Sequence, residues 1–208
     1  MYGKTIFWTG IIGVLWFVIT VVLGGLQFDG YSHIHQYISE SYASGTRYGV
    51  YLRYVGYVPS GLLIAFFAFL APKAVPGSRL TRMGFWSVAV FYGLGTIIVS
   101  IFPCDMGCNP ELINPSISQL IHNLVAVLIY MTVPLSLVVI GIRSKDWPQG
   151  KTISLVTLLS GLLAACFVFV LFSDPKGNYV GLYQRIIEAS ILLWIVCFCL
   201  YIKKNQST

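Results

Sequence analysis

The residue types best suited to chemistry gather in one short hydrophilic stretch and just after it. The stretch runs Phe102-Pro-Cys-Asp-Met-Gly-Cys108, and His122 follows Cys108 by fourteen residues. A carboxylate beside an imidazole fixes the histidine tautomer for proton transfer or for metal binding. Asp105 and His122 are therefore the candidate catalytic residues, with a structural histidine as the alternative.

The two cysteines of this stretch differ in setting from the other three. Cys166, Cys197 and Cys199 fall inside long apolar runs, where a free thiol behaves as a small hydrophobe. Cys104 and Cys108 fall between such runs, where an oxidising compartment allows pairing. We predict a Cys104–Cys108 disulfide. Their spacing differs from Cys-x-x-Cys, which argues against redox catalysis of the thioredoxin type.

Further polar side chains interrupt two of the apolar runs. Arg53, Tyr57 and Ser60 are spaced i, i+4 and i+7, which places them on one face of a helix. Arg185 and Glu188 open the last run, spaced either to pair with each other or to face the bundle interior. Because charges inside a membrane are costly and often functional, we predict that these five residues bind a ligand. A snorkelling Arg53 is the alternative at that position.

A zinc site is a second use for the same chemistry. Tetrahedral zinc needs three or four ligands, and the candidates are His33, His35, His122, Asp105, Glu40, Cys104 and Cys108. His33-x-His35 lacks the usual helical ligand spacing. We predict no resident metal or cofactor, and zinc remains an alternative.

Composition places all these residues in a membrane protein. The 208 residues are 57% hydrophobic and 10% charged, against a charged fraction of about 25% in soluble domains. Six apolar runs are long enough to cross a bilayer as helices: about 5–26, 48–71, 83–103, 118–142, 153–173 and 181–202. The sequence predicts an all-α fold, a single six-helix transmembrane domain over residues 1–208.

The basic residues predict the orientation. If the chain crosses six times, nine of the thirteen Lys and Arg residues share one side, which the positive-inside rule assigns to the cytoplasm. They are Lys4, Lys73, Arg79, Arg82, Arg143, Lys145, Lys151, Lys203 and Lys204. Both termini are expected inside, and the net charge of +6 reflects topology rather than nucleic-acid binding.

Short motifs on the opposite side carry a resemblance. They are Ile38-Ser39-Glu40, Phe102-Pro103 with Asp105, His122, and Gly181-Leu182 with Gln184-Arg185. With these motifs, nearly the whole chain resembles an uncharacterised family, domain of unknown function 998, of six-helix prokaryotic membrane proteins. The resemblance implies a prokaryotic cytoplasmic membrane and brings no established activity.

Ser60, Asp105 and His122 are also similar to the serine, aspartate and histidine of seven-helix membrane hydrolases of the alkaline ceramidase type. The present chain lacks the seventh helix and the late histidine pair of those enzymes.

Two functions follow as expectations. The first is binding of a small polar ligand or lipid head group in an outward-facing polar pocket. The alternative is a lipid-directed hydrolase that uses Asp105 and His122 with a metal or water. Transport is disfavoured because no polar path reaches the inner face. The expected partners are the lipid bilayer and that ligand, and the sequence does not indicate an oligomeric state.

Overall fold

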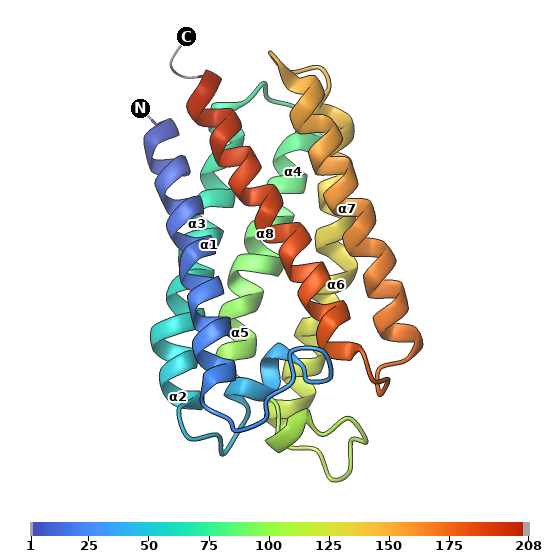
Figure 1. The fold of residues 1–208 in the computed structure, drawn as a ribbon. Coiled ribbons are helices and arrows are strands. Elements are labelled where there is room, and N and C mark those ends of the chain that lie inside the picture. The colour runs from blue at the N-terminus through green and yellow to red at the C-terminus, as the bar shows by residue number, and fades with distance from the viewer. Residues whose placement is uncertain (1, 206–208) are drawn as a thin grey trace.

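Six helical segments of 23 to 28 residues run back and forth in the computed structural model, which describes residues 2–205 (Figure 1). Four are continuous helices: α1 (Tyr2–Leu26), α6 (Ile117–Ser144), α7 (Gly150–Ser173) and α8 (Val180–Asn205). The second segment comprises α2 (Gly49–Tyr51), η2 (Leu52–Tyr57), α3 (Val58–Leu70) and η3 (Ala71–Ala74). The third comprises α4 (Arg79–Ser87), η4 (Val88–Leu94) and α5 (Gly95–Ile101). The predicted six-helix, all-α fold is confirmed, with every segment boundary within four residues of expectation.

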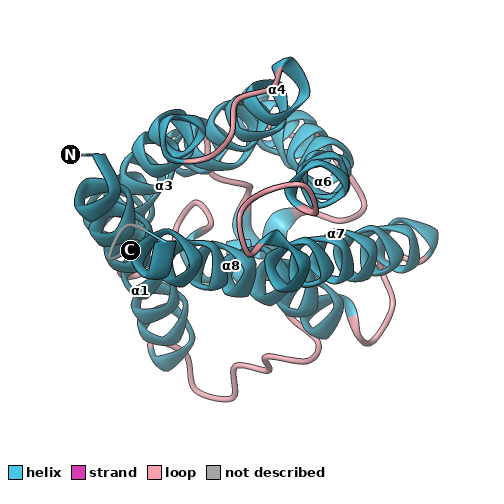
Figure 2. Cartoon of the chain, turned by 90° about the horizontal axis from the view of Figure 1, so that it is seen from above, coloured by secondary structure: helices cyan, strands magenta, loops and turns pink. Residues whose placement is uncertain are grey.

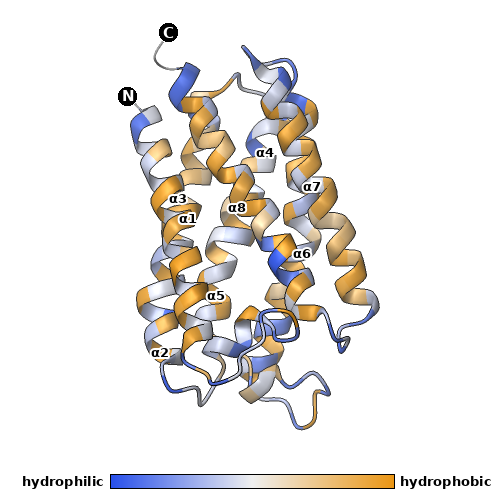
Figure 3. Ribbon diagram, viewed as in Figure 1, coloured by the Kyte–Doolittle hydropathy of each residue, from blue (hydrophilic) through white to orange (hydrophobic). Residues whose placement is uncertain are grey.

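The segments close into a ring. Each contacts its neighbours in sequence, and α8 returns to α1, so the last helix completes the wall that the first begins. Seen from above, the helices surround a common interior (Figure 2). Figure 3 shows apolar residues along the helices, with hydrophilic residues concentrated at the two ends. This distribution is that of a bundle whose outer surface faces lipid.

The two ends of the bundle are different. The described chain ends, Tyr2 and Asn205, lie together at what we call the terminal end (Figure 1). The opposite end carries three longer connections, residues 27–48, 102–116 and 174–179, and we call it the loop end. Two short 3₁₀ helices, η1 (Ile38–Tyr42) and η5 (Met106–Cys108), lie in these connections. The loop end therefore holds most of the polar residues that were selected from the sequence.

Aromatic side chains fill the interior near the terminal end. Phe67, Phe85, Trp194 and Phe198 are fully buried. The ring of Phe198 lies 4.9 Å from that of Phe85 and 5.9 Å from that of Trp194. The Trp194 indole donates to the Thr157 hydroxyl at 3.0 Å. This aromatic core joins α3, α4, α7 and α8.

Two π-helical turns, η2 and η4, interrupt the second and third segments. Pro59 has no N–H, so it cannot donate to the carbonyl of Val55 four residues earlier. That carbonyl instead accepts the Trp16 indole N–H of α1 at 2.8 Å. In η4, Gly93 lets the backbone approach α3, because a Cβ there would lie 2.6 Å from the Cα of Ala65. Each interruption is thus held by a specific contact with a neighbouring helix.

Candidate functional site

A small cavity of about 50 Å³ lies inside the loop-end half of the bundle. Its wall includes Glu188 and Gln184 of α8, His122 and Tyr130 of α6, Tyr57 of η2, Tyr92 of η4, and Thr96 of α5. The remaining lining residues are Phe17, Ile38, Ser39, Tyr42, Val99, Ala126 and Ile129. A space of this size holds about four water molecules, and the carboxylate, imidazole and hydroxyl groups among its lining residues can form hydrogen bonds with them.

Glu188 lies at the centre of the polar wall. One carboxylate oxygen accepts from the Tyr92 hydroxyl at 2.6 Å, and the other accepts from the Tyr130 hydroxyl at 2.9 Å. The Tyr130 oxygen accepts in turn from the Gln184 amide at 3.0 Å. Among residues 2–205 no lysine or arginine forms an ion pair with Glu188. The carboxylate is thus held by neutral donors alone, although its side chain is only 9% exposed.

His122 lines the cavity, and one of its ring nitrogens bonds to the end of α5. Its Nδ1 lies 3.1 Å from the carbonyl oxygen of Val99 and 3.0 Å from that of Phe102, at the end of α5. Because carbonyl oxygens only accept, Nδ1 carries the proton and a neutral ring keeps its lone pair on Nε2. The end of α5 therefore fixes the tautomer of His122. From the sequence we expected the Asp105 carboxylate to do this.

The π-helical turns supply two of the cavity tyrosines. Tyr57 is the last residue of η2, and Tyr92 lies within η4. A π turn shifts the helical register by one residue, and such turns are frequent at functional sites. The ring of Tyr57 also lies 4.6 Å from that of Tyr42 and 5.4 Å from that of Phe17. The irregular backbone in both segments therefore coincides with the cavity.

Residues 31–42, which we call the cap segment, cover the cavity from the loop end. Arg185 of α8 holds this segment, with Nη1 donating to the carbonyls of His33 at 2.7 Å and Gln36 at 2.8 Å. The Gln184 side-chain oxygen accepts from the Ile38 amide at 2.6 Å. A Cβ at Gly181 would lie 2.3 Å from the Gln36 oxygen, so only glycine permits this approach. The motif Gly181-Leu182 with Gln184-Arg185 is thus the attachment of the cap segment.

Within the cap segment, Glu40 accepts from the Tyr37 amide at 2.7 Å and from the Gln36 side chain at 3.2 Å. Burial raises the pKa of the Glu40 carboxyl above its ordinary value. Burial also raises the pKa of Tyr37, to about 12, so its phenol is protonated at neutral pH. The cap segment is therefore held by its own side chains as well as by α8.

A larger groove of about 360 Å³ lies beside the cavity, between α6, α7 and the loops. It shares five lining residues with the cavity: Ser39, His122, Ala126, Tyr130 and Gln184. Its other walls are mostly apolar and include Leu112, Val127, Leu171 and Phe172. These shared side chains therefore place the groove directly beside the cavity.

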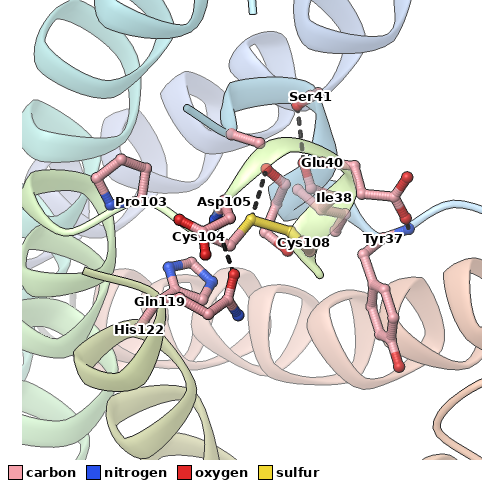
Figure 4. The surroundings of a disulfide bond; sticks show 12 residues. Tyr37, Ile38, Glu40, Ser41, Pro103, Cys104, Asp105, Cys108, Gln119 and His122 are labelled. Carbon is pink, nitrogen blue, oxygen red and sulfur yellow. Dashed lines mark hydrogen bonds between the residues drawn. A yellow bond between two sulfur atoms is a disulfide. The ribbon is translucent and has the colours of Figure 1, made fainter. Parts of the chain in front are cut away.

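Asp105 has a different role from His122. Its carboxylate accepts from the Ser116 hydroxyl at 2.6 Å and from the Ser116 amide at 3.0 Å, just before α6 begins. The Ser116 hydroxyl, through its hydrogen bond, holds the pKa of Asp105 below its ordinary value. The Asp105 amide donates to the Gln119 side chain at 2.7 Å, as Figure 4 shows. Asp105 and His122 are therefore each engaged with other groups, and no observation favours the hydrolase alternative.

The predicted disulfide is present: the sulfur atoms of Cys104 and Cys108 lie 1.96 Å apart. The Ser39 hydroxyl lies 3.2 Å from the Cys108 sulfur and is the donor, since an oxidised sulfur carries no proton (Figure 4). The Ser44 amide donates to the Cys104 carbonyl at 2.8 Å. The disulfide loop is thereby joined to the cap segment.

Of the seven predicted catalytic and ligand-binding residues, the structure brings Tyr57, His122 and Glu188 together at the cavity. Ser60 donates to the Gly13 carbonyl at 3.0 Å and joins α3 to α1. Arg53 is half-buried, with its guanidinium 5.9 Å from the ring of Tyr54. Arg53, Ser60, Asp105 and Arg185 lie outside the cavity wall, and Arg185 and Glu188 bond to other groups rather than to each other.

Three tyrosines of the cavity did not emerge from the sequence, namely Tyr42, Tyr92 and Tyr130, whereas Gln184 appeared there only as part of the family-like motif with Arg185. One signal was available, since Tyr92 and Tyr130 fall in the middle of their spans, whereas membrane tyrosines favour the interfaces. As for zinc, residues 2–205 contain no group of three His, Cys, Asp or Glu side chains that could hold a metal ion.

The fold defines a class, a multi-pass α-helical membrane protein, here with a small cavity among its helices. Residues 11–201 match the family described as "Protein of unknown function (DUF998)", and the chain belongs to that family. No curated protein and no solved structure matches it.

Proposed function

We propose that this protein is a binding protein of a prokaryotic cytoplasmic membrane that takes a small polar ligand or lipid head group into the loop-end cavity. The loop end faces outward, because the nine basic residues that favour the cytoplasm lie at the terminal end. The ligand reaches the cavity through the groove between α6 and α7. The observation that carries the proposal is the side-chain wall shared by the groove and the cavity.

Cysteine labelling tests access to the cavity. Thr96→Cys places a thiol on the cavity wall, and Thr157→Cys makes the same change beside Trp194 in the aromatic core. In the purified full-length protein, methyl methanethiosulfonate should modify Cys at position 96 but not at position 157. Site-resolved mass spectrometry separates these thiols from Cys166, Cys197 and Cys199. Equal protection of both positions would contradict the proposal.

Labelling of intact cells tests the orientation. Lys176 is exposed at the loop end and Lys145 at the terminal end. A membrane-impermeant maleimide should react with Lys176→Cys in intact cells and with Lys145→Cys only after lysis. The reverse pattern would place the cavity opening on the cytoplasmic side and refute this part of the proposal.

A further inference from the structure

We infer that the ligand chemistry of this cavity is a primary ammonium group, carried either by a free amine or by an amino lipid head group. The inference rests on the proposed function, because it specifies what the same cavity binds. It depends on three properties of the wall: unused hydrogen-bond acceptors, an uncompensated carboxylate, and aromatic faces.

Most donors on the wall already have acceptors within the protein. Tyr92 and Tyr130 donate to Glu188, Thr96 donates to the Tyr92 carbonyl at 2.7 Å, and Nδ1 of His122 donates to the end of α5. By contrast, a carboxylate has about four acceptor positions, and protein donors occupy two of those on Glu188. The lone pair of His122 Nε2 adds another acceptor. A ligand that satisfies this wall must supply protons.

The carboxylate also favours a cation. A buried charge without a partner is unfavourable, because desolvation is not repaid by neutral hydrogen bonds alone. Glu188 has two phenol donors and, among the described residues, no ion-pair partner. The described ion pair, Lys176 with Glu111, lies instead on the exposed loops. A cation in the cavity would form an ion pair with Glu188, which has no such partner among the described residues.

Aromatic rings form a large part of the wall. Phe17, Tyr42, Tyr57, Tyr92 and Tyr130 all line the cavity. The centroids of Phe17 and Tyr57 lie 5.4 Å apart and those of Tyr42 and Tyr57 lie 4.6 Å apart. Ring faces attract cations, including a primary ammonium such as that of lysine. The Tyr57 hydroxyl, which makes no hydrogen bond of good geometry, is a further polar contact for the ligand.

The size of the cavity restricts the cation. A volume of about 50 Å³ suits a group of about three or four non-hydrogen atoms. A primary ammonium on a two-carbon arm fits this limit, whereas a branched quaternary ammonium needs more space around its nitrogen. The mostly apolar groove alongside could hold the rest of an amino lipid whose ammonium lies in the cavity. A free amine and an amino lipid would therefore present the same group to the cavity.

Protection of the Thr96→Cys thiol tests the inference in the full-length protein. At equal ionic strength, ethylammonium chloride should slow the modification of this thiol at least tenfold. Ethanol, its neutral counterpart, and tetramethylammonium should leave the rate of modification unchanged. Glu188→Gln should abolish this protection while the thiol remains reactive. Glu111→Gln is the matched control, since it removes an exposed carboxylate and should leave protection unchanged. Equal protection by ethylammonium and ethanol overturns the inference.

Reconstitution identifies the source of the ammonium. Slower labelling in nanodiscs of phosphatidylethanolamine than in phosphatidylcholine supports a lipid head group, whereas protection by ethylammonium alone supports a free amine. If the thiol is reactive but neither amine source protects it, the ammonium inference is wrong and the binding cavity stands. If the thiol never reacts, the proposed function itself fails.

Discussion

At the terminal end the interior of the bundle is filled by aromatic rings, whereas at the loop end aromatic rings surround a space. Phe67, Phe85, Trp194 and Phe198 contact one another directly, and the one polar group of Trp194 bonds to Thr157. Around the cavity, the hydroxyls of Tyr92 and Tyr130 point to a single carboxylate. The same residue class therefore provides tight filling in one half and a polar wall in the other.

The two halves of the interior should differ in what they contribute, with stability at the terminal end and the proposed binding at the loop end. Directly packed rings gain from dispersion and from exclusion of cavities, whereas a buried carboxylate held by phenols contributes specificity more than stability. We therefore expect substitutions at the terminal end to affect unfolding most, and substitutions around the cavity to affect ligand protection most.

Trp194→Ala should have the largest effect on stability. It removes a fully buried ring and leaves Thr157 without its donor, and losses of about 3–5 kcal/mol are typical of such changes. Equilibrium unfolding of the detergent-solubilised protein measures the loss. Phe169→Ala, at a side chain that is 75% exposed toward lipid, is the control and should change stability little. If both variants lose the same amount, the aromatic core is not the stable half.

Arg185→Lys should loosen the cap segment. Arg185 donates from one nitrogen to three carbonyls and from the other to the Tyr31 hydroxyl at 2.9 Å. An ammonium lacks this forked geometry, and lost charge-assisted hydrogen bonds cost about 1.5–3 kcal/mol. Hydrogen exchange of amides 33–38 should accelerate about tenfold or more. Arg53→Lys, the same change at an arginine of η2, is the control. If exchange of amides 33–38 is unchanged in Arg185→Lys, Arg185 does not hold the segment.

Tyr130→Phe should cost more than Tyr92→Phe. Removal of the Tyr130 hydroxyl leaves both a carboxylate oxygen and the Gln184 amide without partners, whereas removal of the Tyr92 hydroxyl affects the carboxylate alone. An unsatisfied buried polar group costs about 1–3 kcal/mol, so the two variants should differ by about 1 kcal/mol in unfolding free energy. Equal losses would indicate that Gln184 finds another acceptor.

Asp105→Ala should have the smallest effect, and that effect should depend on pH. Hydrogen bonds from Ser116 lower the pKa of Asp105 below its ordinary 3.8. The contribution to stability is therefore fully present above that ordinary value and disappears as the pH falls through the lowered pKa. The melting-temperature difference between wild type and variant should be constant from pH 7 to pH 5 and smaller at pH 3. A difference that persists at pH 3 would assign the effect to something other than the carboxylate.

Hydropathy was sufficient for the fold because each crossing needs about twenty apolar residues whatever its neighbours are. The disulfide was also predictable, since both thiols fall in one loop, where a turn can bring them together and an oxidising compartment allows pairing. The cavity was harder to predict from the sequence. Glu188 and His122 stood out as polar residues in apolar runs, but Tyr92 and Tyr130 resembled ordinary packing residues.

The interruptions of the second and third segments explain much of what was missed. Uniform helical spacing grouped Arg53, Tyr57 and Ser60 on one face, yet the π turn at Leu52–Tyr57 changes that register. Only Tyr57 then reaches the cavity. The attachment of Arg185 to the cap segment depends on contacts across about 150 residues of chain, which no local pattern encodes.

That attachment has a consequence for biosynthesis. Ribosomes complete the helix containing Gly181 and Arg185 long after the segment that it fastens, so a nascent chain lacks the enclosed site until its final crossing is inserted. Premature termination before position 181 would yield five spans with an unfastened surface loop and no Glu188. The cell thus obtains a competent site only from a fully translated polypeptide.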